Sequence, residues 1–278
     1  MIQSLQYEFM QNALMAGLLA SIACGVIGSY VLVKRIVFIS GGISHTAYGG
    51  VGLGYLLGIS PLLGATGFAL VAAVTIGVAS LRLKAAADTV IGIIWATGMA
   101  LGILFVSLAP GATPELMTYL FGNVLMVARG DIYLMMGLVV SILLVVAALY
   151  KEFLAVAFDE EYAEVLGLPV NRLYLILLAL VAMTVILLMR VVGIIMVIAL
   201  LTLPPATARL FVDRLGPMMG VSVLVGVVTT TCGLILSYVF NVVSGKPIPS
   251  GPVIILLAAG VYLLSLAARH LFSPSDTT

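Results

Sequence analysis

Nine apolar stretches, most of them long enough to cross the hydrocarbon core of a bilayer, dominate this sequence. A transmembrane α-helix needs about 20 consecutive apolar residues to cross about 30 Å of hydrocarbon. The stretches occupy residues 9–33, 36–58, 61–81, 89–108, 131–150, 173–189, 191–211, 217–243 and 252–268. With 63% hydrophobic and only 8% charged residues, the chain has more apolar surface than one water-soluble core could bury. We therefore expect an all-α, polytopic transmembrane helical bundle of about eight or nine spans, forming one domain over residues 1–278.

The basic residues favour one orientation of this bundle. Cytoplasmic loops of membrane proteins carry an excess of lysine and arginine. If the loop that contains Lys34 and Arg35 is cytoplasmic, strict alternation puts all of the 12 basic residues inside except Arg129, Arg190 and Lys246. The N-terminus is then outside and the C-terminus inside. The net charge of +1 comes from charges spread thinly over loops, so we expect no nucleic-acid partner.

The predicted external loop, residues 109–130, contains an apolar run at residues 116–127. This run is too short to cross a bilayer, and irregular backbone is not tolerated in contact with lipid. We therefore expect an interfacial or re-entrant segment at the outer surface.

The predicted cytoplasmic loop, residues 158–172, has the pattern of a short helix. Asp159 is a candidate N-cap, Gly167 a C-terminal stop, and Pro169 lies just beyond it. The apolar residues of this helix share one face at spacings of three and four residues, and these are Tyr162, Val165 and Leu166. Its polar side carries Asp159, Glu160, Glu161 and Glu164.

One histidine lies in the middle of the second stretch, VFISGGISHTAYGGVGLGYLLG. His45 is nine residues beyond Ile36, or roughly 14 Å at 1.5 Å per residue, which is close to the bilayer midplane. An ionisable side chain at that depth indicates a functional site, and an imidazole is a common metal ligand. The alternative is a neutral histidine that hydrogen-bonds a neighbouring helix. Gly41 and Gly49 precede and follow His45 by four residues, so we interpret them as leaving space around the imidazole.

Other small and rigid residues in the spans have simpler interpretations. Gly50, Gly54 and Gly58 repeat the spacing by which transmembrane helices approach closely, so we predict helix packing there. Pro204 and Pro205 remove backbone donors from the seventh stretch and predict a break or kink. A carbonyl freed in this way could instead touch an ion.

The chain lacks the motifs of an energy-coupling enzyme. No GxxxxGK[ST] phosphate loop is present, so we expect no ATP binding by that motif. No paired catalytic residues occur at depth, so we expect no enzymatic activity and no bound cofactor. A secondary transporter or ion channel stays open as an alternative, although no chain of buried carboxylates supports proton coupling.

Several motifs together resemble the membrane subunit of ABC importers for zinc, manganese and iron(II). They are GGISHTAYGGVGLGYLLG, DTVIGIIWATGMALGILF, YLFGNVL, FDEEYAEVLGLPV, VVGIIMVIALLTLPPATARL and IPSGPVIILLA, which cover most of the chain in order. The resemblance implies a homodimeric permease in a prokaryotic plasma or inner membrane. It also implies an extracytoplasmic metal-binding protein and a separate cytoplasmic ATPase as partners.

The resemblance also implies roles for particular residues. His45 would be a metal ligand on the pathway, with Gly41, Gly49, Gly50, Gly54, Pro204 and Pro205 in helix packing or a gate. The helix that docks into the ATPase would be formed by Asp159, Glu160, Glu161, Tyr162, Ala163, Leu166 and Gly167.

The chain departs from this family's pattern at one position. Many members carry an aspartate four residues before the histidine, and here that residue is Gly41. A site that has histidine but no carboxylate favours zinc over manganese, because manganese prefers oxygen ligands. A chelated metal or a cobalamin-like compound is the alternative substrate.

Overall fold

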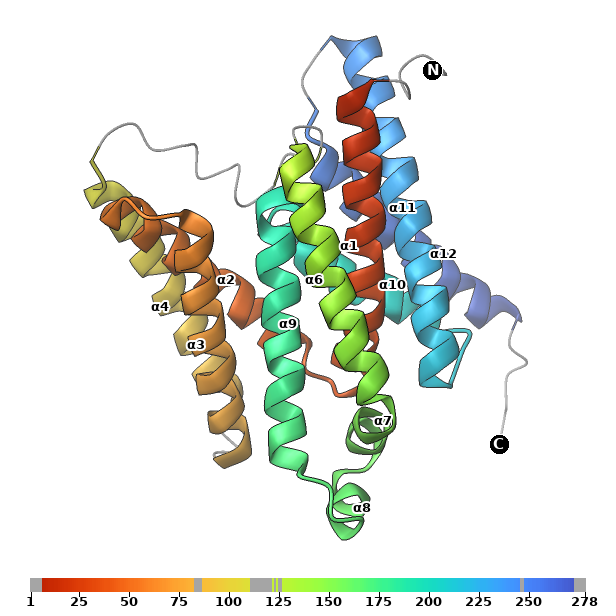
Figure 1. Cartoon of the computed structure of the whole chain (residues 1–278). Helices are drawn as coiled ribbons and strands as arrows, with labels where there is room; N and C mark the ends of the chain where they lie inside the picture. Colours follow the sequence, from red (N-terminus) through yellow and green to blue (C-terminus); the bar gives the residue numbers. More distant parts are fainter. Residues whose placement is uncertain are drawn as a thin grey trace.

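The computed structural model describes residues 7–82, 87–110, 122, 124, 127–245 and 248–272 (Figure 1). Within these residues the chain forms α-helices and no β-strand. The helices are α1 Glu8–Val33, α2 Val37–Leu57, α3 Pro61–Arg82, α4 Ala87–Leu108, α6 Arg129–Ala148, α7 Tyr150–Phe158, α8 Glu160–Val165, α9 Val170–Val192, α10 Ile194–Arg209, α11 Leu215–Ser244 and α12 Ser250–Phe272. Each of the nine apolar stretches forms one long helix, so the predicted all-α transmembrane fold is confirmed.

Seven of these helices are long and apolar enough to cross a membrane. The two others from the nine stretches are α10, which has 16 residues, and α2, which has 21 residues but contains glycines, hydroxyl side chains and His45. Protein rather than lipid surrounds α2, since it packs against α3, α4, α9 and α10. A helix covered by its neighbours can therefore cross the membrane with a lower hydropathy.

The core of the bundle lies around α1 and α9. In each of these two helices 72% of an 18-residue apolar segment is buried, against 22% of the corresponding segment in α4 and 17% in α12. α1 contacts α6, α9, α10 and α11, whereas α2, α3 and α4 form a separate group that joins the rest through α9 and α10. Figure 1 shows this group on the left and α8 at the lower end of the bundle. The apolar side chains of α4 and α12 are therefore largely exposed on the surface of the single chain.

Two glycines bring α2 against α3. A Cβ atom added to Gly50 would overlap the carbonyl oxygen of Gly64, and one added to Gly54 would lie 2.6 Å from Cα of Pro61. The two backbones are thus in contact with no side chain between them. Gly58, the third glycine of the row, ends α2 with a φ of 65°, and a Cβ there would meet no atom within 4 Å.

Gly50→Ala is expected to destabilise the protein by about 1–3 kcal/mol, because the added methyl group must push the backbone of α3 away. The measurement is the thermal unfolding midpoint of the detergent-solubilised protein. Gly67→Ala, on α3, is the matched control, since its Cβ would meet no atom within 4 Å. Equal midpoints for the two variants would contradict the close packing of α2 on α3.

The helix boundaries differ from the predicted stretches at two places. α9 and α10 are separated by Gly193 alone, with a φ of 79°, so α9 is longer and α10 shorter than the sequence indicates. Glycine adopts this backbone conformation without the steric cost that a side chain brings. The amphipathic helix α7 was not predicted. Most of the expected interfacial or re-entrant segment, residues 109–130, lies outside the described residues.

Candidate functional site

α2 places His45 in the interior of the α2–α4 group. His45 is the ninth of the 21 residues of this helix, and its side chain is half-buried. Its ring stacks on the indole of Trp95 from α4, with ring centroids 4.3 Å apart and planes inclined by 13°. Nδ1 of the imidazole is buried and has no hydrogen-bond partner within the described part of the chain. The histidine is therefore held by an aromatic stack rather than by a polar network.

The neighbouring glycines lie against α4. A Cβ atom added to Gly41 would lie 3.1 Å from Cζ3 of Trp95, and one added to Gly49 would lie 2.7 Å from the carbonyl oxygen of Gly98. Both glycines thus allow α2 and α4 to approach. Thr46 connects the same two helices, since its hydroxyl lies 2.7 Å from the carbonyl oxygen of Gly42 and 3.1 Å from that of Ile94.

None of the described carboxylates lies in the middle of a long helix. They are found in the first turns of helices, in α8 or in a loop, and are Glu8, Asp88, Asp131, Glu152, Asp159, Glu160, Glu161, Glu164 and Asp213. Among the described residues, no three histidine, cysteine, aspartate or glutamate side chains gather into a cluster that could hold a metal ion. Within the described part of one protomer, the imidazole of His45 therefore has no carboxylate grouped with it that could complete a metal site.

The two prolines of α10 are buried, and Pro205 packs against α1. α10 continues through Pro204 and Pro205 without interruption. Because Pro205 has no N–H, the carbonyl group of Leu201 loses its helical partner. This carbonyl lies directly against Gly28 of α1, where a Cβ atom would overlap it. The freed carbonyl of Leu201 is thus in contact with another helix.

The short helix α8 has the boundaries that the sequence predicts. Asp159 is its N-cap and accepts a hydrogen bond from the backbone N–H of Tyr162 at 2.9 Å, and Gly167 ends the turn after it with a φ of 76°. Ala163 is fully buried against the bundle, whereas the predicted apolar face is exposed. The exposed fractions on that face are 57% for Tyr162, 84% for Val165 and 56% for Leu166.

Lys34 holds α8 against the bundle, which the sequence did not predict. Its Nζ atom donates a hydrogen bond of 2.9 Å to the carbonyl oxygen of Val156 in α7 and forms an ion pair with Glu160. The side chain of Lys34 is only 9% exposed. Glu160 is therefore paired within the chain although its side chain is 52% exposed, and Glu161 and Glu164 are further exposed acidic residues of α8.

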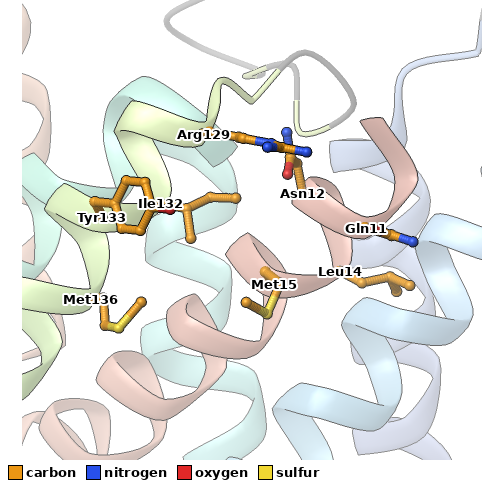
Figure 2. Close-up of a pocket in the computed structure, with 8 residues that line it drawn as sticks. All are labelled: Gln11, Asn12, Leu14, Met15, Arg129, Ile132, Tyr133 and Met136. Carbon is orange, nitrogen blue, oxygen red and sulfur yellow. The ribbon is translucent and has the colours of Figure 1, made fainter. Parts of the chain in front are cut away.

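A pocket of about 520 Å³ opens between α1 and α6 at the other end of the bundle (Figure 2). Arg129 and Asn12 lie at its upper rim in the figure, with Met15 and Met136 below them. Arg129 is paired with Glu8 at 2.6 Å, and the Asn12 amide donates to the carbonyl oxygen of Val127 at 3.1 Å. None of the residues assigned from the sequence lines this pocket, so it is separate from the His45 site.

These features define a polytopic α-helical membrane protein with a half-buried histidine near the middle of α2 and a capped, exposed helix at one end. A family model described as the ABC 3 transport family matches residues 6–269. The chain is 49% identical to an uncharacterized membrane protein of Synechocystis over 97% of this chain and 94% of that protein. It is 35% identical to a manganese transport system membrane protein of Listeria monocytogenes, over 98% of this chain and 93% of that protein.

The fold is also that of a solved structure. PsaBC from Streptococcus pneumoniae matches with a TM-score of 0.84 and 33% identity, over 95% of this chain and 94% of that one. The chain belongs to the ABC 3 transport family. It is accordingly a multi-pass cell-membrane protein, and the family identified from the sequence motifs is confirmed.

Proposed function

We propose that this chain is the permease subunit of an ABC importer for divalent transition metal ions, with zinc preferred over manganese. Two copies form the pathway, and each contributes His45. A cytoplasmic ATP-binding cassette ATPase binds at α8, and an extracytoplasmic metal-binding protein delivers the ion at the opposite end. ATP is hydrolysed by the partner chain, and the metal is a transported substrate rather than a resident cofactor.

The observation that carries this proposal is the half-buried imidazole of His45 in a helix that has no Asp, Glu, Lys or Arg. An ionisable group at that depth is costly and usually belongs to a substrate pathway. One imidazole from each protomer gives a weak site, and a weak site suits passage because an ion held tightly would not leave. The absence of a described carboxylate at this level favours zinc, since manganese prefers oxygen ligands.

Manganese is the second candidate, because the relatives in Listeria are named as manganese transport system proteins. Sequence identity of 35% leaves room for a change at a ligand position. Gly41, which stands where many family members carry an aspartate, is such a position. We therefore place zinc first because position 41, one turn before His45, is a glycine and supplies no carboxylate.

The exposed face of α8 supports an ATPase as the cytoplasmic partner. Three apolar side chains are exposed on it, beside the carboxylates of Glu161 and Glu164. An anionic inner leaflet would repel these carboxylates. A protein groove is therefore a better partner for α8 than lipid, which favours an importer driven by an ATPase over a transporter that works alone.

The test is uptake of radioactive zinc and manganese into proteoliposomes that contain the permease, its ATPase and the metal-binding protein. We expect ATP-dependent uptake of both ions, with zinc preferred when they compete. Uptake that does not require ATP would support the ATPase-independent transporter instead. Uptake that requires a chelator would support a chelated metal as the substrate, and a preference for manganese would overturn the assignment of zinc.

A further inference from the structure

Trp95 is the only tryptophan in the chain, and its indole lies on the imidazole of His45. Contacts with α2 at Ile94 and Gly98, which precede and follow Trp95 in the sequence, fix the position of α4. The hydroxyl of Thr46 hydrogen-bonds the carbonyl oxygen of Ile94 at 3.1 Å, and a Cβ atom on Gly98 would lie only 2.6 Å from Cα of Thr46. α4 therefore cannot slide along α2 without breaking these contacts, and the stack has a defined register.

The indole covers more than the imidazole. Gly41 lies one turn before His45, and a Cβ atom there would lie 3.1 Å from Cζ3 and 3.5 Å from Cη2 of Trp95. The first of these distances is shorter than an ordinary van der Waals contact, so a side chain at position 41 must displace the indole. Trp95 therefore occupies the space that a carboxylate from position 41 would need.

The stack also restricts how an ion can reach the imidazole. A metal binds an imidazole nitrogen through its in-plane lone pair, and the indole covers one face of the ring while leaving its edge open. Nδ1 is enclosed and has no hydrogen-bond partner in the described part of the chain. The edge that carries Nε2 is thus the one left for an ion.

We propose that Trp95 is a positioning residue that determines ion specificity at His45, by fixing the plane of the imidazole and excluding a carboxylate from position 41. This inference rests on the proposed function, in which His45 is a metal ligand. The resulting site offers a metal the imidazole nitrogen of His45 and no carboxylate oxygen from position 41. It selects borderline ions such as zinc and cobalt over manganese.

The first experiment uses the fluorescence of Trp95 in the full-length chain in nanodiscs, excited where tyrosine does not absorb. Cobalt(II) is the probe, because a paramagnetic ion on the stacked imidazole quenches the indole. We expect saturable quenching that zinc reverses and that manganese reverses poorly. In His45→Ala the emission persists and the saturable quenching is lost. Identical quenching in both proteins would overturn the proposal.

The second experiment measures zinc and manganese uptake by the complete complex as KM and maximal rate. Trp95→Leu is expected to raise the KM for zinc by about tenfold, as loss of a group that orients a metal ligand does, with a smaller change in maximal rate. Trp95→Phe keeps an aromatic stack and should restore most of the affinity. Phe105→Leu, ten residues further along α4, is the control for loss of an aromatic side chain.

The third experiment tests the coupling between positions 41 and 95. Gly41→Asp alone is expected to lower zinc uptake, because the new side chain displaces the indole. In Gly41→Asp/Trp95→Phe the smaller ring leaves room for the carboxylate, so uptake of manganese relative to zinc should rise. We expect the two substitutions to be non-additive, as for residues in contact. Additive effects would overturn the steric part of the proposal.

The outcomes separate this proposal from the proposed function. If His45→Ala abolishes uptake while Trp95→Leu keeps the wild-type KM and the same preference between zinc and manganese, Trp95 is a packing residue and the metal pathway stands. If cobalt quenching depends on His45 but uptake does not, the stacked site binds metal and the assignment of His45 to the pathway is wrong.

Discussion

Replacing His45 with alanine is expected to reduce ATP-dependent zinc uptake by about tenfold or more. Loss of groups that only orient a metal ligand already costs about 10–100-fold in affinity. In the proposed dimer, His45→Ala removes the proposed ligand itself from both copies of the chain. The substitution leaves a cavity beside Trp95 but removes no hydrogen bond of the described residues. Expression, dimer formation and binding of the extracytoplasmic partner should therefore persist. The measurement is initial uptake into proteoliposomes that contain the complete complex.

The second histidine of the chain provides the matched control. His270 lies in the last turn of α12 and is exposed, so His270→Ala removes an imidazole without touching the α2–α4 group. We expect wild-type uptake from this variant. Wild-type rates for both zinc and manganese in His45→Ala would reduce His45 to a packing residue.

The double substitution Tyr162→Asp/Leu166→Asp places two aspartates on the exposed face of α8. We expect it to abolish stimulation of the ATPase. Both side chains are more than half exposed, so the substitutions create no buried charge in the permease alone. In the complex they would place unpaired charges in an apolar contact, which is costly. The measurements are ATPase activity of the reconstituted complex and co-purification of the ATPase with the permease.

A charge of the same kind at the opposite end of the bundle controls for indirect effects. Tyr7 is 56% exposed at the N-cap of α1, where aspartate is a favourable residue. Tyr7→Asp should leave both the ATPase stimulation and the co-purification unchanged. Full stimulation in Tyr162→Asp/Leu166→Asp would show that α8 is not where the ATPase binds.

Local features of the fold were predictable because their causes lie within a few residues of one another. The apolar stretches are long enough to form helices in a bilayer regardless of their neighbours. The boundaries of α8 follow from a side-chain cap at Asp159 and a glycine at position 167, and both interactions span three or four residues. The family could be identified for a related reason, since its motifs are continuous in the sequence.

The glycines of α2 illustrate what could be predicted only in part. Their spacing predicts close approach of a helix, but it does not identify the partner. The structure assigns Gly50 and Gly54 to α3, and Gly41 and Gly49 to α4. The interpretation of Gly41 and Gly49 as open space around the imidazole did not anticipate Trp95, because that residue is distant in the sequence. Two signals in the sequence could have pointed to Trp95: it is the single tryptophan of the chain, and it lies within a predicted span.

The sequence by itself thus determined the membrane-spanning α-helical character of this protein, the approximate bounds of its long helices, the capped helix α8 and the position of His45 near the middle of α2. Each of these follows from hydropathy, helical rise or a contact within one turn, and none needs a distant residue. Only the tertiary structure decided that Trp95 covers His45 and Gly41, that Lys34 engages Glu160, and that the carbonyl group of Leu201 packs against Gly28. These contacts join residues 50 to 173 positions apart, and which side chains meet across such separations depends on how the whole bundle packs.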